Sequence, residues 1–436
     1  MDKANYSDYR EYDIAHNATI HRWILRRTAA YVIAYLVIAV APCCQMAQAA
    51  EDPVKGRLQH LLDDYVAQRS NAEGVSGVAL TLDAGRRHPI LSLFSGSDGL
   101  SGAKPIGSDT LFQIGSNTKH FTAALVLKLE AMGKLDIHQT VGHWLPQYQA
   151  WRDTTIQSLL NMTSTIPNYS ETQEIGQIEA ADIHHQFPPR ALIAAVDPDK
   201  GRHLPTPSGW FYSNTNDILA ALIIERASGM SYEIALRKLI LEPLHLRNTF
   251  YSGGPYPRAV LNRVPRGLYE NQDCLDYQPK PCDRSTLAPL IGQDMRTQNL
   301  SWAAAAGGMI SNPRDLDQWV RDLFSLRVLP KKQFDEMTSM VSDKTGLAIS
   351  DVSAADPSGF ALNLGRKYAP EPVGPFWFYQ GTTLGFRALF AYWPQHDLVI
   401  TAITNSQPRT GQDQFAPVVV DGARRIVQDA GWLSGH

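Results

Sequence analysis

A serine and a lysine three residues apart, Ser116 and Lys119, stand at the start of an apolar-periodic segment. Residues three apart lie on the same face of an α-helix, so the Lys119 amine can approach the Ser116 hydroxyl oxygen. The first backbone N–H groups of a helix have no partner within the helix and favour negative charge. A hydroxyl, an amine and available N–H groups together indicate a nucleophile that attacks a carbonyl.

The same spacing occurs at Ser101 and Lys104, but a glycine between them and a proline directly after them disfavour a helix there. The segment after Ser116 keeps its apolar period until Gly133, which offers a helix C-cap. Helix context therefore favours Ser116 over Ser101 as the nucleophile.

A lysine with an ordinary pKa of about 10.4 is protonated at neutral pH and cannot accept a proton. Tyr212 and Asn214 precede a second apolar segment, residues 218–226, which we expect to be helical. A tyrosine near the lysine can relay a proton, and an asparagine amide can bind both the lysine and a substrate carbonyl. We therefore predict that Tyr212 and Asn214 lie beside Ser116.

A third segment, residues 376–386, is rich in aromatic residues and contains Gly381. A glycine in a strand permits the close approach of another backbone. An N–H group of this strand would complete an oxyanion hole with the N–H of Ser116.

The elements that must position these residues begin and end the chain. We expect a helix over residues 53–68, strands over 75–82, 89–94, 376–380, 386–393 and 398–404, and a last helix over 416–429. This order predicts an α+β fold in which an antiparallel sheet, built from both ends of the chain, is flanked by helices. A mainly helical subdomain is inserted at about residues 120–310. The Pro-rich stretch 251–299 lacks periodicity, and we expect it to be an extended surface excursion.

The chain has 436 residues, a formal net charge of −3 and 44% hydrophobic residues, which permits a large core and makes nucleic-acid binding unfavourable. The motifs of α/β-hydrolases, zinc peptidases and phosphate-binding loops are absent from the sequence. The pair His184-His185 has no ligand set at metal spacing and is predicted to be loop surface. The proposed chemistry requires no metal and no cofactor.

The N-terminal segment has the pattern of a secretory signal peptide, with Arg22, Arg26 and Arg27 before an uncharged stretch over 28–41. We expect residues 1–49 to be the signal peptide and residues 50–436 to be a single exported domain, periplasmic or secreted. An uncleaved membrane anchor is the alternative, and we expect membrane contact if the N-terminal segment stays uncleaved. Lipidation at Cys43 or Cys44 is disfavoured, because Pro42 stands where a small residue such as glycine or alanine is expected.

Cys274 and Cys282 are the two cysteines of the expected mature domain. Thiols pair in an oxidising compartment, so we predict a disulfide between them. Two free surface thiols are the alternative.

The three segments, in this order and at this spacing, resemble the serine β-lactamase and penicillin-binding-protein superfamily. The resemblance is to the branch with class C β-lactamases, D-alanyl-D-alanine carboxypeptidases and related esterases, in which Ser-x-x-Lys is a signature. It covers nearly all of the expected mature chain and includes stretches similar to family landmarks at residues 133–136, 156–160, 242–244 and 307–311. The resemblance implies the β-lactamase/transpeptidase-like fold.

The resemblance also implies roles for five residues. Ser116 would be the nucleophile, Lys119 the activating amine and Tyr212 the proton relay. Asn214 would bind the substrate amide, and Thr382 would supply the second N–H of the oxyanion hole.

The third motif departs from the family pattern, because Tyr379 stands where a lysine or histidine usually opens it. Relatives bind a substrate carboxylate near this position, and a tyrosine brings no positive charge at neutral pH. Arg387, six residues after Gly381, is a candidate to supply the missing charge, and an arginine at a strand start with its head in solvent is the alternative.

These observations predict an exported serine acyl hydrolase that acts through a seryl acyl-enzyme on a small-molecule or peptide substrate. The first expectation is a D-alanyl-D-alanine carboxypeptidase-like activity on cell-wall peptides or amides. A carboxylesterase or amidase, favoured by Tyr379, and a β-lactamase are the alternatives. A non-catalytic penicillin-recognition module is a further alternative.

Overall fold

The computed structural model describes residues 53–196, 209–270, 285–409 and 412–433. The predicted signal peptide and the two cysteines of the predicted disulfide, Cys274 and Cys282, lie outside the described residues. Within the described ranges, no helix combines the length and the apolar character needed to cross a membrane.

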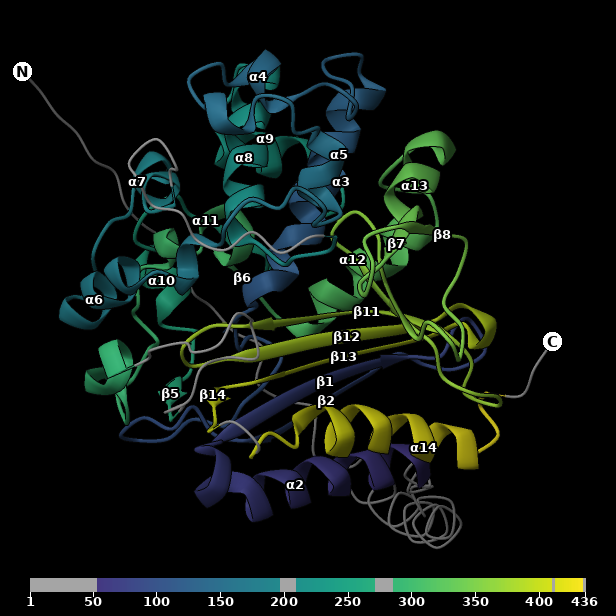
Figure 1. The fold of residues 1–436 in the computed structure, drawn as a ribbon. Coiled ribbons are helices and arrows are strands. Elements are labelled where there is room, and N and C mark those ends of the chain that lie inside the picture. Colours follow the sequence, from purple (N-terminus) through teal and green to yellow (C-terminus); the bar gives the residue numbers. More distant parts are fainter. Residues whose placement is uncertain (1–52, 197–208, 271–284, 410–411, 434–436) are drawn as a thin grey trace, which may run out of the picture. The chain divides into compact units, whose positions relative to one another are not determined.

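The central element of the described part of the chain is a nine-stranded antiparallel sheet with the strand order β2-β1-β13-β12-β11-β10-β9-β7-β8 (Figure 1). Its strands are β1 (Gly77–Asp83), β2 (Leu91–Gly96), β7 (Met340–Ser342), β8 (Ala348–Ile349), β9 (Ser358–Phe360), β10 (Gly365–Lys367), β11 (Phe376–Thr382), β12 (Arg387–Trp393) and β13 (Leu398–Thr404). Leu80 of β1 pairs with Ala402 of β13, so the two ends of the chain meet in the middle of the sheet. This confirms the predicted sheet and the α+β fold class.

One face of the sheet packs on two terminal helices, α2 (Pro53–Glu73) and α14 (Asp421–Asp429), which lie side by side beneath the strands in Figure 1. Leu58 and Leu62 of α2 join Leu80 and Ile400 of the strands in one buried cluster. A π-helical turn, η9 (Phe415–Val420), leads into α14. Because both faces of β1 and β13 are covered, every residue of these strands is buried, and most of them are apolar.

The opposite face carries the inserted helical region and the helices that follow it (Figure 1). These helices are α3 (Thr118–Ala131), α4 (Val141–Trp144), α5 (Ile156–Leu160), α6 (Gln173–Ala181), α7 (Pro189–Ala194), α8 (Asn214–Ser228), α9 (Tyr232–Leu236), α10 (Arg258–Leu261), α11 (Ala304–Gly307), α12 (Pro313–Phe324) and α13 (Lys331–Thr338). Helices α3 and α8 are buried on most of their faces and pack against each other. They form the centre of the helical layer, and each begins at a predicted site segment.

Two small sheets complete the fold. β3 (Phe112–Gln113), β6 (Met309–Ser311) and β4 (Phe250–Tyr251) form an antiparallel set, while β5 (Leu268–Tyr269) pairs with β14 (Ser406–Gln407) in parallel. β3 leads directly into the turn that carries Ser116, so its pairing with β6 fixes where that turn starts.

The stretch predicted to be a surface excursion is partly core, and the prediction is wrong for those of its described residues that are buried. Tyr256, Tyr269 and Met295 are buried, and the last two share a small apolar cluster with Leu384. This stretch is anchored by single large side chains that are buried in the core, and their spacing follows neither a helical nor a strand period. Periodicity therefore gave no signal for it.

Candidate active site

Ser116 lies in a single 3₁₀ turn, η1 (Gly115–Asn117), between β3 and the first turn of α3. Lys119 follows at the start of α3 and is fully buried. Its Nζ atom donates hydrogen bonds to Ser116 Oγ at 3.1 Å and to the Ala306 carbonyl oxygen at 2.6 Å. The structure thus brings Ser116 and Lys119 together as predicted. The Ala306 carbonyl oxygen of α11 is a further hydrogen-bond acceptor for Lys119, and no sequence motif predicts it.

Tyr212 reaches Ser116 from the extended segment that leads into α8. Its hydroxyl donates to Ser116 Oγ at 2.8 Å, and Lys119 Nζ lies 4.9 Å from the centre of its ring. Two groups that can carry a proton therefore converge on one serine oxygen. Ser116 itself is 9% exposed, so the nucleophile sits in a largely dehydrated environment.

The electrostatics of the site favour a lysine that can lose its proton. Burial lowers the pKa of Lys119 to about 8, and the nearby Asp217 carboxylate partly opposes this shift. A lysine with this pKa is neutral in about a tenth of the molecules at pH 7, whereas an unperturbed lysine is almost entirely charged. A neutral amine can accept the Ser116 proton.

Asp217 and Asn363 are site residues that the sequence analysis missed. Both are fully buried, and the Asn363 amide nitrogen donates to Asp217 Oδ1 at 2.8 Å and to the Lys119 carbonyl oxygen at 3.1 Å. Burial raises the pKa of Asp217 to about 7, and the Lys119 charge opposes that rise. An aspartate three residues after Asn214, inside an apolar helix, is a signal that could have found Asp217. Asn363 has no local signal.

The end of β11 packs directly against the nucleophile turn. A Cβ atom on Gly381 would lie 2.8 Å from the Ser116 backbone nitrogen and would overlap the Ile114 carbonyl oxygen. Gly115 has a φ of +51°, and a Cβ atom there would lie 2.6 Å from the Thr382 backbone nitrogen. The two glycines place the backbones of Ser116 and Thr382 side by side, which is the arrangement required of an oxyanion hole.

A buried polar chain holds the nucleophile turn against β12. The Trp319 indole donates to His120 Nδ1 at 2.8 Å, and His120 Nε2 lies 3.4 Å from Asn117 Oδ1. The Asn117 amide nitrogen donates to the Ala388 carbonyl oxygen at 3.0 Å. Burial lowers the pKa of His120 to about 3, so this histidine is neutral at physiological pH.

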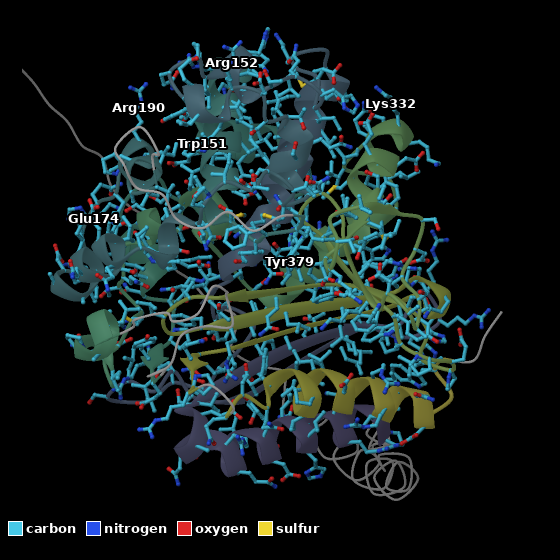
Figure 2. The ribbon with its side chains drawn as sticks, viewed as in Figure 1. Trp151, Arg152, Glu174, Arg190, Lys332 and Tyr379 are labelled. Atoms are coloured by element: carbon cyan, nitrogen blue, oxygen red, sulfur yellow. The ribbon has the colours of Figure 1, made fainter. Side chains whose placement is uncertain are left out.

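The Tyr379 side chain is buried beneath the site and is not exposed to solvent. Its ring lies edge-on to His120, at a centroid distance of 5.8 Å, and against Phe360 at 6.0 Å. Figure 2 places Tyr379 between the strands and the overlying helices. The position that usually carries a cation in the resembled family is therefore occupied by an aromatic ring beside a neutral imidazole.

The prediction that Arg387 supplies the missing cation is wrong. Its side chain is fully buried on the opposite side of the sheet, where it bonds Asp413 and lies 2.8 Å from Glu73 Oε2. It also donates to the Ser406 carbonyl oxygen at 2.8 Å and stacks over Phe415. Side chains alternate between the two faces of a strand, and position 387 points toward α2 and η9. The arginine is an internal ion-pair residue.

Asn214 is the first residue of α8, but the structure does not join it to Lys119. Its side-chain amide donates to Ser170 Oγ at 2.9 Å, and its backbone N–H donates to Asn168 Oδ1 at 3.1 Å. These contacts fix the start of α8 just after Tyr212. His184 and His185, as predicted, are exposed.

Comparisons with known proteins agree with this fold. The family model described as "Beta-lactamase" matches residues 62–423. Penicillin-binding protein 4* of Bacillus subtilis is 34% identical over 148 residues, which are 34% of this chain and 32% of that protein. Esterase EstB of Burkholderia gladioli is 29% identical over 226 residues, which are 47% of this chain and 53% of the esterase. The matched parts thus span about a third to a half of these relatives.

Among solved structures, a D-stereospecific amidohydrolase from Streptomyces sp. is similar with a TM-score of 0.64 and 26% sequence identity, covering 85% of this chain and 98% of that one. The chain therefore belongs to the beta-lactamase family.

Proposed function

We propose that this protein cleaves amide bonds of small or peptide-like substrates through an acyl-enzyme on Ser116. The observation that carries the proposal is the convergence of Tyr212 OH and Lys119 Nζ on Ser116 Oγ, at 2.8 and 3.1 Å. The similarity to the Streptomyces amidohydrolase over 85% of this chain supports amide chemistry.

In the first half-reaction, Ser116 Oγ forms a bond to the substrate carbonyl carbon as its proton passes to neutral Lys119. The transfer is either direct or by way of Tyr212, which hands on its own hydroxyl proton as it accepts the one from Ser116. The N–H groups of Ser116 and Thr382 stabilise the oxyanion, and each such donor contributes about 3–4 kcal/mol in hydrolases of this general type. The carbon–nitrogen bond then breaks, and the leaving amine takes the proton that the site holds. Water repeats the sequence on the acyl-enzyme and releases the acid.

The surroundings of the third motif favour substrates without a carboxylate at that point. Tyr379 is packed against neutral His120, and Arg387 is committed to Glu73 and Asp413. A carboxypeptidase would require a cation to bind the terminal carboxylate of its peptide. This makes the carboxypeptidase-like activity a weaker proposal than an amidase.

Ester hydrolysis is the second candidate, and the similarity to EstB over 226 residues favours it. Esters need less help for the leaving group than amides, so the same serine, lysine and tyrosine would suffice. A turnover panel separates the candidates: an amino acid amide, a nitrophenyl butyrate, a D-Ala-D-Ala peptide and a cephalosporin, each with wild type and Ser116→Ala. Highest kcat/KM on the amide supports the proposal, and turnover that Ser116→Ala retains contradicts it.

We also infer that the protein is exported, on the support of the arginines that precede the uncharged stretch 28–41. Cell fractionation with N-terminal sequencing tests this. An exported protein that begins near residue 50 is expected, and a cytoplasmic protein that begins at Met1 would contradict the inference.

A further inference from the structure

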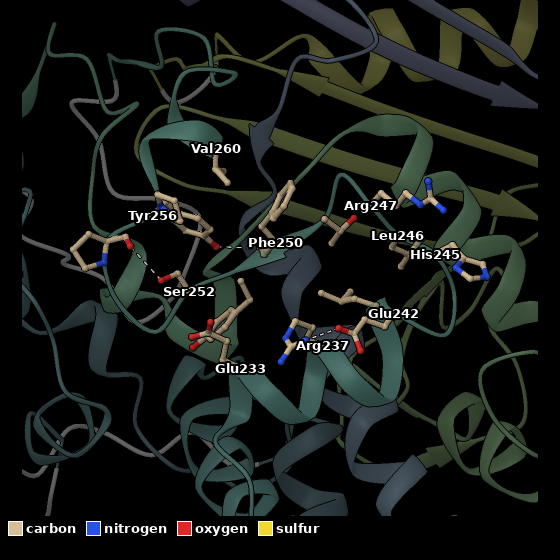
Figure 3. A pocket seen from close by; sticks show the side chains of 15 residues that line it. Glu233, Arg237, Glu242, His245, Leu246, Arg247, Phe250, Ser252, Tyr256 and Val260 are labelled. Atoms are coloured by element: carbon tan, nitrogen blue, oxygen red, sulfur yellow. Dashed lines mark hydrogen bonds and ion pairs between the residues drawn. The ribbon is translucent and has the colours of Figure 1, made fainter. Parts of the chain in front are cut away.

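A cavity lies apart from the seryl site, between α9, the π-helical turn η5 (Arg237–Leu241) and residues 245–260 (Figure 3). Its volume is about 540 Å³, within the range of roughly 300–1,000 Å³ that is typical of small-ligand pockets. Ser116, Lys119, Tyr212 and Thr382 do not line it.

The floor of the cavity is apolar and fixed in place. Leu241, Tyr256 and Val260 are buried beneath it, and Phe250 forms a further aromatic wall. The Tyr256 hydroxyl donates to the Gly308 carbonyl oxygen and, at 3.2 Å, to the Phe250 carbonyl oxygen. Backbone-anchored aromatic rings of this kind do not need to rearrange before an apolar group enters.

Four charged residues on the rim matter here. Two of them form an ion pair with each other, and the other two, Glu233 and Arg247, have opposite charges and no ion pair with a described residue. Arg237 and Glu242 form an ion pair with each other. Glu233 accepts a long hydrogen bond of 3.4 Å from the Gly253 N–H, and no ion pair with a described residue neutralises it. Arg247 has neither a hydrogen bond nor an ion pair within the described ranges. Figure 3 shows Glu233 and Arg247 on opposite sides of the cavity.

The surroundings of Glu233 suit an ammonium group. Tyr251 lies beside it and lines both this cavity and a smaller one of about 230 Å³, of which Glu233 is also a lining residue. Glu225 lines the smaller cavity. Burial raises the pKa of Tyr251, and the negative charges of Glu233 and Glu225 raise it further. Carboxylates and an aromatic ring together attract an organic cation.

We propose that this cavity binds a short apolar peptide with free termini, whose ammonium faces Glu233, whose carboxylate faces Arg247 and whose side chains cover the aromatic floor. A ligand with a single charge would pair with either Glu233 or Arg247 and leave the other without a partner. A zwitterion with an apolar body matches both ends and the floor.

Calorimetric titration of the full chain with leucyl-phenylalanine tests the proposal. The Ser116→Ala background prevents turnover of the peptide. N-acetyl-leucyl-phenylalanine lacks the ammonium, and leucyl-phenylalanine amide lacks the carboxylate. Both residues are exposed on the rim, so we expect Glu233→Gln and Arg247→Gln each to weaken leucyl-phenylalanine binding by about twofold to fivefold, the range of solvent-exposed charge pairs.

The matched ligands make the assignment specific. Binding of the acetylated peptide should be insensitive to Glu233→Gln, and binding of the amide should be insensitive to Arg247→Gln. Lys332→Gln and Asp335→Asn, exposed on α13 and outside the cavity, serve as charge-matched controls and should leave binding unchanged.

Val260→Trp, which fills the cavity, should abolish binding in a protein whose thermal unfolding shows that it is folded. The proposal is overturned if leucyl-phenylalanine does not bind at millimolar concentration. It is equally overturned if binding occurs but neither Glu233→Gln nor Arg247→Gln changes it, as binding in the seryl site would give.

Discussion

Asp217 and Lys119 are fully buried on neighbouring helices, and the amide of Asn363 joins them by donating to the Asp217 carboxylate and to the Lys119 carbonyl oxygen. The lysine that must lose a proton thus has a titratable acid close by. The negative charge of Asp217 raises the pKa of Lys119, whereas burial lowers it to a net value of about 8. In the proposed mechanism, this pair is expected to set the pH at which Lys119 can accept the Ser116 proton.

Asp217→Asn should move the rising limb of the kcat/KM profile to lower pH. The asparagine can still accept the hydrogen bond from Asn363, but it removes the charge that stabilises protonated Lys119. The pKa of Lys119 then falls, and a larger fraction is neutral at pH 7. The measurement is kcat/KM against pH between 5 and 10, with exposed Asp136→Asn as the control. An unmoved limb, or one at higher pH, would contradict the role given to Asp217.

Tyr212→Phe should lower kcat by about 10²–10⁴, the range typical of a positioned acid or base. The change removes the hydroxyl that lies 2.8 Å from Ser116 Oγ and leaves the ring beside Lys119. KM should change little, because the ring stays in place. Tyr368→Phe, an exposed tyrosine, is the matched control. A kcat within threefold of wild type would show that Tyr212 carries no proton.

Gly381→Ala should impair catalysis more than stability. The added Cβ atom would press on the Ser116 backbone nitrogen and the Ile114 carbonyl oxygen, and overpacking of this kind costs about 1–3 kcal/mol. Displacing the turn would misalign the oxyanion hole and lower kcat by about 10² or more. Gly107→Ala, with open space around its Cβ, is the control. Steady-state kinetics and urea unfolding measure both effects, and unchanged kcat would refute the close packing.

Glu73→Gln should destabilise the fold without affecting substrate binding. Glu73 and Arg387 are fully buried, and removing one partner of a buried ion pair costs about 3–5 kcal/mol. The free energy of unfolding in urea should fall accordingly, while KM measured below the unfolding transition stays constant. Arg57→Gln breaks an exposed pair with Asp429 and should cost less than about 1 kcal/mol. A large rise in KM would contradict this prediction, because it would indicate that Arg387 contributes to substrate binding.

The elements at both ends of the chain could be predicted because their patterns are long. The expected strands 75–82 and 398–404 became β1 (Gly77–Asp83) and β13 (Leu398–Thr404). Strands β7 to β10 have two or three residues each, which is too short for alternation to be recognised, and sheet neighbours alone define them.

The core of the site could be predicted because it rests on local spacing. Ser116 and Lys119 are one turn apart, and Tyr212 directly precedes a helix. Asn363 and the Ala306 carbonyl oxygen could not be predicted, since their contacts with Lys119 join residues far apart in sequence. Arg387 was misassigned because the sequence does not reveal which face of β12 its side chain occupies. Nor does the sequence reveal that Glu73, its ion-pair partner, lies on that face.

Covalent labelling of Ser116 tests the central claim most directly. Wild type and Ser116→Ala are treated with a fluorophosphonate, and intact mass and peptide mapping locate the adduct. Ser101→Ala is the control, since Ser101 has the same spacing to a lysine but lies in an exposed turn. We predict one adduct, on Ser116, with matching loss of amide turnover, in wild type and Ser101→Ala alike. An adduct on another residue, or full turnover by Ser116→Ala, would contradict the account.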